Sequence, residues 1–345
     1  AGNLEVHFID EGQGDATLIK CDGHSMLIDA GNNDKGTLVQ NYLQHQGVET
    51  LDYVIGTHPD ADHIGGMDVV LYKFDCKTII MPDVANNTRT YDDVVQTMKN
   101  KGYKTTYPVV GETYTIGGAA FTIIAPNKEY GNDMNSWSVG VLLQNGNHRF
   151  LFTGDAEEGA EQDILQNGID ISADVYKVAH HGSNTATSQA FLDAVHPTYA
   201  VISAGEGNSY GHPHAEVLNR LRAAGVSVFR TDEQGTIVAT SDGTTLTWNM
   251  SPSESWQAGE AKKSQNTEKS EKAADSQNNA ETDAAVSNPT DQTDGNSDVI
   301  VHITKTGEKY HSAGCQYLRQ SDIEVTLSEA KARGLTPCSK CNPPQ

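Results

Sequence analysis

The sequence predicts an α/β protein in which one large domain is followed by a polar linker and a small metal-binding module. Short apolar runs typical of strands alternate with helix-length segments through residues 1–250. A turn at residues 57–66 concentrates histidine and aspartate. Residues 251–298 then lose almost all large apolar side chains, and residues 299–345 contain three of the five cysteines. We therefore predict these three ranges as the domain organisation.

Composition limits the class of protein. The chain has 345 residues, of which 37% are hydrophobic, and 32 glycines fit an α/β protein with many turns. No apolar run approaches the roughly 18 to 20 residues that a membrane span requires, so we expect a soluble monomer without a membrane span. The sequence starts at Ala1 without methionine, which fits either a secreted protein whose signal peptide has been removed or an engineered chain. We expect a secreted protein.

Charge and cysteine usage narrow the function further. The formal net charge is -22, from 24 basic and 46 acidic residues. This argues against a protein that binds nucleic acid through a general basic surface, so a nuclease would have to rely on metal ions and local patches. An odd number of cysteines with three near the end favours metal binding over disulfides.

The pattern of elements is regular. The first three predicted strands, at residues 4–9, 16–20 and 25–28, are separated by glycine-containing turns, which predicts that they pair in antiparallel order. The turn sequence Asn145-Gly146-Asn147 predicts a hairpin. The predicted strands are at residues 4–9, 16–20, 25–28, 51–55, 78–81, 114–116, 121–124, 138–144, 149–153, 175–179, 199–203, 236–239 and 244–248, and the predicted helices are at 37–46, 67–72, 91–101, 157–166 and 189–195.

The turn at residues 57–66 reads Thr-His-Pro-Asp-Ala-Asp-His-Ile-Gly-Gly and lies between a predicted strand and a predicted helix. Within six residues it offers two imidazoles and two carboxylates, from His58, Asp60, Asp62 and His63. Ordinary solvated turns use Asn, Gly and Ser far more than paired His and Asp. The alternative is a polar turn without a ligand, but the composition favours a metal site.

This turn resembles the His-x-His-x-Asp-His signature of the metallo-β-lactamase superfamily, with Asp60 in place of the second histidine. Together with Ile64-Gly65-Gly66 it looks most like the hydrolase domain of ComEC-type competence proteins and their free-standing secreted relatives. The resemblance covers about residues 3–248. It implies a four-layer αβ/βα fold. The channel and membrane parts of a full competence protein are not in this sequence, so we do not expect DNA uptake.

The resemblance gives roles to later motifs. Asp155 follows a predicted strand and Gly154, where the superfamily places an aspartate that bridges two metals; the alternative is a helix N-cap. Consecutive His180 and His181 end a predicted strand, so their side chains should point to opposite faces, one binding metal and the other meeting substrate. Both could instead be structural.

A Gly-His-Pro-His loop containing His212 and His214 recurs beside the site in ComEC-like domains. These imidazoles suit phosphate contact or proton donation to a leaving group, with helix capping as the alternative. The family also places the equivalents of Asp10, Asp15 and Asp29 near the metal site. They could orient histidine ligands or simply form turns.

These roles imply a ligand set. The only histidine between the central turn and Asp155 is His148, which the hairpin turn places badly for binding metal. Oxygen-rich donors shift preference from zinc towards Mn²⁺ or Mg²⁺, so we expect one or two divalent metals, zinc or manganese. One position would use His58, Asp60 and Asp155, and the other Asp62, His63, Asp155 and either His180 or His181.

The end of the chain differs in composition. Residues 251–298 are rich in Ser, Glu, Lys, Gln, Asn, Asp and Ala, which predicts a disordered linker. In residues 299–345, His311-x3-Cys315 and Cys338-x2-Cys341 form a tetrahedral zinc pattern, with a helix expected at residues 327–333. A module of this size has too small a core to be stable alone and needs a bound metal or another cross-link. It resembles the metal-binding domain of Ada-type DNA repair proteins. A disulfide is the alternative. The net charge of +2, from six basic and four acidic residues, is compatible with tethering nucleic acid.

We therefore expect a secreted metal-dependent hydrolase, a phosphodiesterase or nuclease that attacks DNA with a metal-activated water. The candidate catalytic residues are Asp62, His180, His212 and His214. One alternative is hydrolysis of another phosphoester or an ester, such as phosphorylcholine on a cell surface. Another is a non-catalytic surface-binding protein with a degenerate site, which should hold zinc only in its tail.

Overall fold

The computed structural model describes residues 1–259, 300–304, 309–312, 318, 323–332, 335–338 and 341. The chain divides into two units, Ala1–Asn266 and Thr267–Gln345. The first unit contains two sheets and the second contains one, and each unit has its own buried core.

The first sheet of the large unit begins with the predicted antiparallel strands. β1 and β2 pair with Leu4 opposite Cys21, and β2 and β3 continue the antiparallel order. From β3 to β6 the strands are parallel. The strand order is β15 (Leu246–Trp248), β14 (Ile237–Ser241), β1 (Leu4–Phe8), β2 (Thr17–Cys21), β3 (His24–Ile28), β4 (Thr50–Ile55), β5 (Asp75–Ile80) and β6 (Thr105–Thr106).

The second sheet contains the predicted hairpin, in which His148 pairs with Asn145 across a turn and Gly146 takes a φ of 59°. That left-handed conformation favours glycine. Strands β10 to β13 are parallel. The strand order is β13 (Ser227–Arg230), β12 (Tyr199–Ile202), β11 (Val175–Lys177), β10 (His148–Phe152), β9 (Gly140–Asn145), β8 (Ala119–Ala125) and β7 (Thr113–Ile116).

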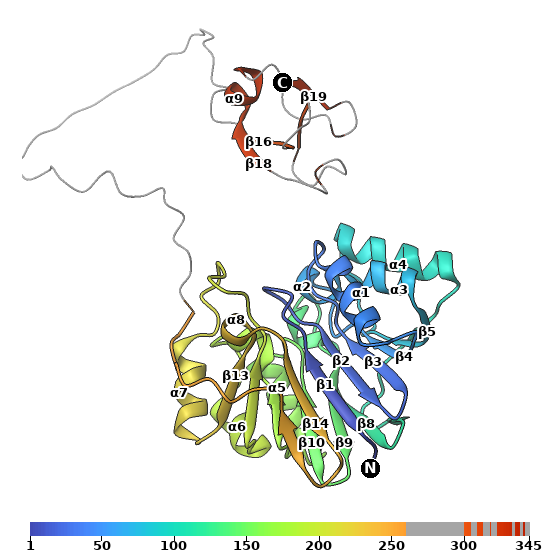
Figure 1. Ribbon diagram of the computed structural model, residues 1–345, viewed down its shortest axis with the longest axis vertical. Coiled ribbons are helices and arrows are strands. Elements are labelled where there is room, and N and C mark those ends of the chain that lie inside the picture. The colour runs from blue at the N-terminus through green and yellow to red at the C-terminus, as the bar shows by residue number, and fades with distance from the viewer. Residues whose placement is uncertain are drawn as a thin grey trace, which may run out of the picture. The chain divides into compact units, whose positions relative to one another are not determined.

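Helices cover the outer face of each sheet (Figure 1). Alternation along β2 explains how a strand serves two layers: Ile19 joins the core between the sheets, whereas Leu18 packs under the helices. The predicted four-layer arrangement is confirmed. The longer helices are α1 (Gly36–His45), α3 (Met67–Lys73) and α4 (Arg89–Lys101) on the first sheet, and α5 (Glu158–Gln166), α6 (Gln189–Val195) and α7 (Ala215–Ala223) on the second.

Residues 251–259 do not begin a linker, contrary to the composition-based expectation. The Ser253 N–H donates to Val228 O at 2.7 Å, and the Gly259 N–H donates to Pro213 O at 2.8 Å. Trp256 packs against the core beneath α7. The serines that suggested disorder instead donate hydrogen bonds to the Glu233 carboxylate. The remainder of the predicted linker, residues 260–298, lies outside the described residues.

The small unit forms a four-stranded sheet around a core that includes Val301, Tyr310 and Leu327. The expected helix is present as α9 (Leu327–Ala332). The strand order is β18 (Ile323–Thr326), β16 (Ile300–Ile303), β17 (Lys309–His311) and β19 (Thr336–Pro337). Across the described parts of both units, every helix is too short or too polar to cross a lipid bilayer.

Candidate metal centre

The carboxyl ends of strands from both sheets supply the site. The turn at residues 57–66 follows β4 and contains the short helix α2 (Ala61–Ile64), while Asp29 follows β3. From the second sheet, Asp155 follows β10 and the histidine pair follows β11. Ligand sites in α/β proteins form at this edge because loops from neighbouring parallel strands meet there.

Four donors from these loops converge. Ligand atoms of Asp62, His63, Asp155 and His181 all lie within 4.8 Å of one another. His63 Nε2 is 3.0 Å from Asp155 Oδ1, and His181 Nε2 is 3.2 Å from Asp62 Oδ2. Three of these side chains are buried and Asp62 is partly buried. Of the two candidates for the late histidine, His181 belongs to this group.

The donor atoms fit a divalent cation. His63 Nε2, His181 Nε2 and Asp155 Oδ1 are buried without a hydrogen-bond partner, although the first and last are only 3.0 Å apart. Buried polar atoms left in this way cost free energy, of the order of 1 to 3 kcal/mol each. A cation bound between them would compensate all three. Two imidazoles and two carboxylates make a ligand set that transition metals accept.

A second group of donors lies near Asp155 Oδ2. His58 Nε2 is also buried without a hydrogen-bond partner, 3.6 Å from Asp60 Oδ2 and 4.0 Å from Asp155 Oδ2. His180 Nε2 is 3.7 Å from the same Asp155 oxygen. Donors of both groups therefore approach the Asp155 carboxylate. It does not cap α5, whose N-cap residue is Glu157.

Buried partners fix the orientation of the ligand rings. His63 Nδ1 lies 2.7 Å from Asp29 Oδ2, and Asp29 in turn accepts from Thr57 N and Oγ1. His181 Nδ1 donates to Ser203 O at 3.1 Å. When Nδ1 is engaged in this way, Nε2 is the nitrogen left to bind a metal.

The same carboxylates set the protonation of the rings. Burial alone would lower the pKa of His181, but Asp155 and Asp62 outweigh it and raise that pKa to about 9. The pKa of His63 is raised well above its usual range, against burial, by Asp155 and Asp29. At about pH 7 each ring is therefore protonated on both nitrogens and carries a positive charge, and a metal would have to displace the Nε2 proton. Metal binding therefore releases protons and becomes tighter as the pH rises.

The backbone at His180 and His181 differs from the predicted strand end. β11 stops at Lys177, and both histidines lie in the 3₁₀ turn η2 (Ala179–Gly182) with φ values of 50° and 54°. Left-handed backbone at two successive side-chain-bearing residues replaces the strand alternation, so the expectation of opposite faces was wrong. Both rings instead approach Asp155. His181 is buried, whereas the His180 side chain is 20% exposed.

The two histidines of the loop at residues 211–214 have different surroundings. His212 is buried, and its ring stacks on His181 with centroids 6.0 Å apart. Burial, His181 and His180 lower the pKa of His212 to about 3, so its ring is neutral. His214 accepts from the Asn184 N–H at Nδ1, and its Nε2 lies 3.2 Å from Tyr210 O. With both nitrogens engaged by the backbone, His214 anchors the loop and does not fit the predicted proton donor.

Of the three aspartates expected near the site, two are there. Asp15 forms an ion pair with Lys177 at 2.7 Å and lies 3.7 Å from His181 Nδ1, and Asp29 orients His63. Asp10 instead accepts from the Gly12 N–H within its own turn. His148 contacts Ser241 Oγ at 2.7 Å, in agreement with its exclusion from the ligands.

Some residues of the site were missed by sequence reasoning. Ser138 Oγ lies 3.3 Å from His58 Nδ1 and accepts from the Asp155 N–H, so it connects the two donor groups. Glu11 is buried behind the site, in contact range of Gly14 and Gly31. The one signal in the sequence was Lys177, a cation inside an otherwise apolar strand.

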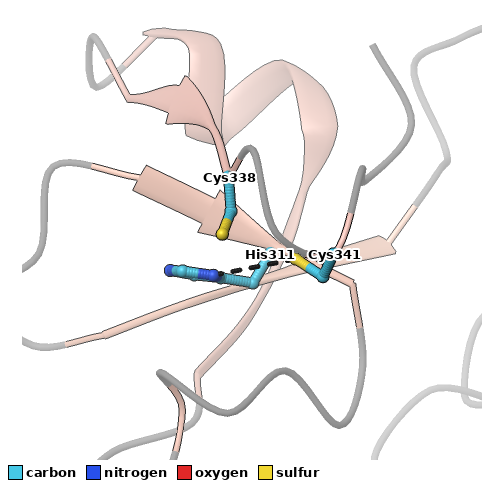
Figure 2. A group of neighbouring side chains, drawn as sticks. All are labelled: His311, Cys338 and Cys341. Carbon is cyan, nitrogen blue, oxygen red and sulfur yellow. Dashed lines mark hydrogen bonds between the residues drawn. The ribbon is translucent and has the colours of Figure 1, made fainter.

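The small unit holds a separate cluster. Donor atoms of His311, Cys338 and Cys341 lie within 4.8 Å of one another, and His311 Nδ1 is 3.9 Å from Cys341 Sγ (Figure 2). Parallel pairing of β17 with β19 places Tyr310 beside Pro337 and so brings His311 near Cys338. The fourth predicted ligand, Cys315, lies outside the described residues.

Comparisons with curated proteins give relatives that are named for competence and recombination. The chain is 31% identical over 255 residues to ComE operon protein 3 of Bacillus subtilis, which covers 68% of this chain and 32% of that protein. It is 32% identical over 238 residues to Recombination protein 2 of Haemophilus influenzae, covering 68% and 28%. Competence protein ComA of Neisseria gonorrhoeae is 29% identical, with 66% and 31% covered. The chain spans less than a third of the length of these relatives.

Among solved structures, the metallo-beta-lactamase fold protein YhfI of Bacillus subtilis is 13% identical with a TM-score of 0.47, covering 70% of this chain and 100% of that one. The diiron beta-hydroxylase CmlA of Streptomyces venezuelae is 13% identical with a TM-score of 0.45, covering 67% and 53%. The model of the metallo-beta-lactamase superfamily matches residues 9–206, which is more than half of the chain. The chain therefore belongs to the metallo-beta-lactamase superfamily.

Proposed function

We propose that this protein is a metal-dependent phosphodiesterase that cleaves DNA. The observation that carries the proposal is the donor set, in which the carboxylates of Asp60, Asp62 and Asp155 stand beside the histidines. Oxygen-rich sites favour hard cations, which also bind phosphate oxygens. Relatives named for competence and recombination support a role that involves DNA.

Different residues would bind the metal and transfer the proton. A bound divalent cation supplies an activated water and offsets the charge that develops on phosphate. Asp62, His63, Asp155 and His181 hold that cation, and their buried partners keep them in place. His180 is the partly exposed imidazole beside Asp155, with Nδ1 3.4 Å from Glu157 Oε1. It is therefore the residue placed to contact substrate and move a proton at the leaving group.

The active-site metal is proposed to be manganese or zinc, in one or two positions. The second position, with His58, Asp60 and Asp155, has a less compact set of donors, with separations of 3.6 and 4.0 Å. It should therefore bind the more weakly held ion. We also propose a structural zinc in the small unit, held by His311, Cys338 and Cys341 together with Cys315. Three buried or partly buried soft donors in one small module support it.

Cleavage of plasmid and single-stranded DNA by metal-stripped protein, re-supplied with Mn²⁺, Mg²⁺ or Zn²⁺, tests the function. Asp62→Ala should abolish cleavage, because it removes a ligand. Asp34→Ala, at an exposed aspartate in the same unit, is the matched control and should cleave normally. Failure of the wild-type protein to cleave DNA with metal bound would contradict the proposal.

Hydrolysis of a phosphorylcholine ester and metal analysis, carried out on the same proteins, separate the alternatives. Hydrolysis of a phosphorylcholine ester without cleavage of DNA would identify a different phosphoesterase. A protein that holds zinc only in its tail would be a binding protein with a degenerate site. The secreted location and the monomeric state remain predictions, which fractionation of producing cells and light scattering would test.

A further inference from the structure

One large aromatic ring lies exposed beside the metal centre. Tyr210 is 63% exposed, in the loop between β12 and α7. Its ring stacks on His212 with centroids 5.5 Å apart and planes 17° apart. His212 stacks in turn on His181, at 6.0 Å and 24°. Three nearly parallel rings therefore lead from solvent to a candidate metal ligand.

Side-chain hydrogen bonds hold the backbone of the loop that carries this ring. Asn208 Oδ1 accepts from the N–H groups of Tyr210, at 3.1 Å, and His212, at 3.0 Å. Asn208 Nδ2 donates to the carbonyls of Gly205 and His212. From the other side, His214 Nε2 lies 3.2 Å from Tyr210 O. Because the loop is already ordered, a ligand that stacks on Tyr210 loses little free energy to ordering it.

The geometry of the ring indicates the kind of ligand. His212 covers one face of Tyr210 and the residue is 63% exposed, so at most the opposite face is left for a ligand to stack on. Quaternary ammonium groups such as choline are bound by cages in which several rings surround the cation. A planar group needs only one open face, and every nucleobase has one. The net charge of -22 also leaves stacking as a stronger source of affinity than attraction to the phosphate backbone.

We propose that Tyr210 is a stacking platform for a nucleobase next to the scissile phosphodiester of a single-stranded substrate. The inference rests on the proposed function and adds the substrate class. Bases of a duplex are stacked on one another and are not available to Tyr210, so single strands should be preferred. The recognition should be indifferent to sequence, because all four bases can stack.

Two measurements on full-length, metal-loaded protein test the platform. The first is steady-state cleavage of a single-stranded oligonucleotide and of the same strand with abasic residues around the cleaved position. The second is the fluorescence of 2-aminopurine in a phosphorothioate strand that resists cleavage. The variants are Tyr210→Leu, which removes the aromatic face, and Tyr210→Phe, which keeps it. Tyr72→Leu, at a tyrosine that is 64% exposed on α3, is the matched control.

We expect Tyr210→Leu to raise KM for the normal strand about tenfold, with little change for the abasic strand. Tyr210→Phe and Tyr72→Leu should behave as wild type. Binding should quench 2-aminopurine in wild type and in Tyr210→Phe, but not in Tyr210→Leu. An equal loss on normal and abasic strands, or no loss on either, would overturn the platform.

The two proposals fail in different ways. If quenching depends on Tyr210 but neither wild type nor any variant cleaves DNA, the nuclease function is overturned and the stacking platform is supported. Cleavage without dependence on Tyr210 would overturn the platform alone. Neither binding nor cleavage would overturn both. If Tyr210→Leu lowers activity only towards a phosphorylcholine ester, the ligand of Tyr210 is a cation and the nucleobase proposal is overturned.

Discussion

At the scale of single residues, Glu11 shows how loops that close around a metal site can enclose a carboxyl group. A Cβ at Gly14 would lie 2.2 Å from Glu11 Oε1, and one at Gly31 would lie 2.5 Å from Oε2, so only glycine permits this approach. Oε1 has no hydrogen-bond partner, and Oε2 receives only a 3.5 Å contact from the Asn32 N–H. Burial, with the nearby Asp15 charge adding to it, raises the pKa of Glu11 to about 7.

This raised pKa predicts how stability depends on pH. The folded protein keeps the Glu11 proton up to pH about 7, whereas the unfolded chain loses it near 4.5, so stability falls as the pH rises through that window. In metal-stripped protein, Glu11→Gln should therefore unfold with a free energy up to about 3 kcal/mol higher than wild type at about pH 8. At about pH 4 the two should be equal. Urea unfolding across this range measures the difference.

Glu206→Gln, at an exposed glutamate, is the control and should follow wild type at every pH. A constant difference between Glu11→Gln and wild type across the range would show that Glu11 does not titrate in this window.

The residues that sequence reasoning found and missed differ in one respect. His58, Asp60, Asp62 and His63 stand together in the chain, so their density alone indicates a metal site. Ser138 reaches His58 across 80 positions, and Lys177 reaches Asp15 across 162. Such contacts depend on how two sheets come together, which no local pattern contains. For that reason the cluster of donors in the turn could be found from the sequence, whereas most of the side chains that support it could not.

At the scale of elements, the segment at residues 251–259 supports the loop beside the metal centre. Its Gly259 N–H donates to Pro213 O, and Trp256 lies against Arg222 of α7. Arg230, at the end of β13, donates to Gln257 O. A segment with the composition of a linker therefore forms part of the scaffold that holds His212.

Gly259 is tightly enclosed in this segment. A Cβ there would lie 2.1 Å from His212 O and 2.5 Å from His212 C, both backbone atoms that cannot swing away. We expect Gly259→Ala to lower stability by about 1 to 3 kcal/mol and to shift the His212 imidazole resonances in NMR spectra. The loop must move to accommodate the methyl group.

The control is Gly159→Ala on α5, where an added Cβ meets nothing within 4 Å. Alanine is the better helix former, so this variant should be as stable as wild type or slightly more so, with unchanged His212 resonances. Unchanged resonances in Gly259→Ala would show that the segment does not position the loop.

Many elements were predicted from local patterns, but α7 and β13 were not, although α7 buries Val217, Leu218 and Leu221 along one face. The antiparallel start, the hairpin at Asn145 and the helix ending at Gly102, with its φ of 71°, all followed from local chemistry. The prediction failed at His180 and His181, where two left-handed residues follow a strand of three. Tertiary contacts such as the one from His181 to Ser203 O hold that turn. A rule about strand alternation cannot anticipate it.

At the scale of the whole molecule, the two units carry separate donor clusters. Asp62, His63, Asp155 and His181 belong to the large unit, and His311, Cys338 and Cys341 belong to the small one. The first set is rich in oxygen, and the second is dominated by thiols. Ligand softness therefore predicts different metals for the two sites, with zinc in the small unit and a harder ion accepted by the large one.

The measurement that tests this account most directly is the metal content of wild type, Asp155→Ala and Cys338→Ser by inductively coupled plasma mass spectrometry, with circular dichroism to verify folding. Wild type should contain metal in both units. Asp155→Ala should lose the active-site metal and keep the tail zinc, whereas Cys338→Ser should do the reverse. An Asp155→Ala protein that is folded and retains the full wild-type metal content would contradict the proposed metal centre.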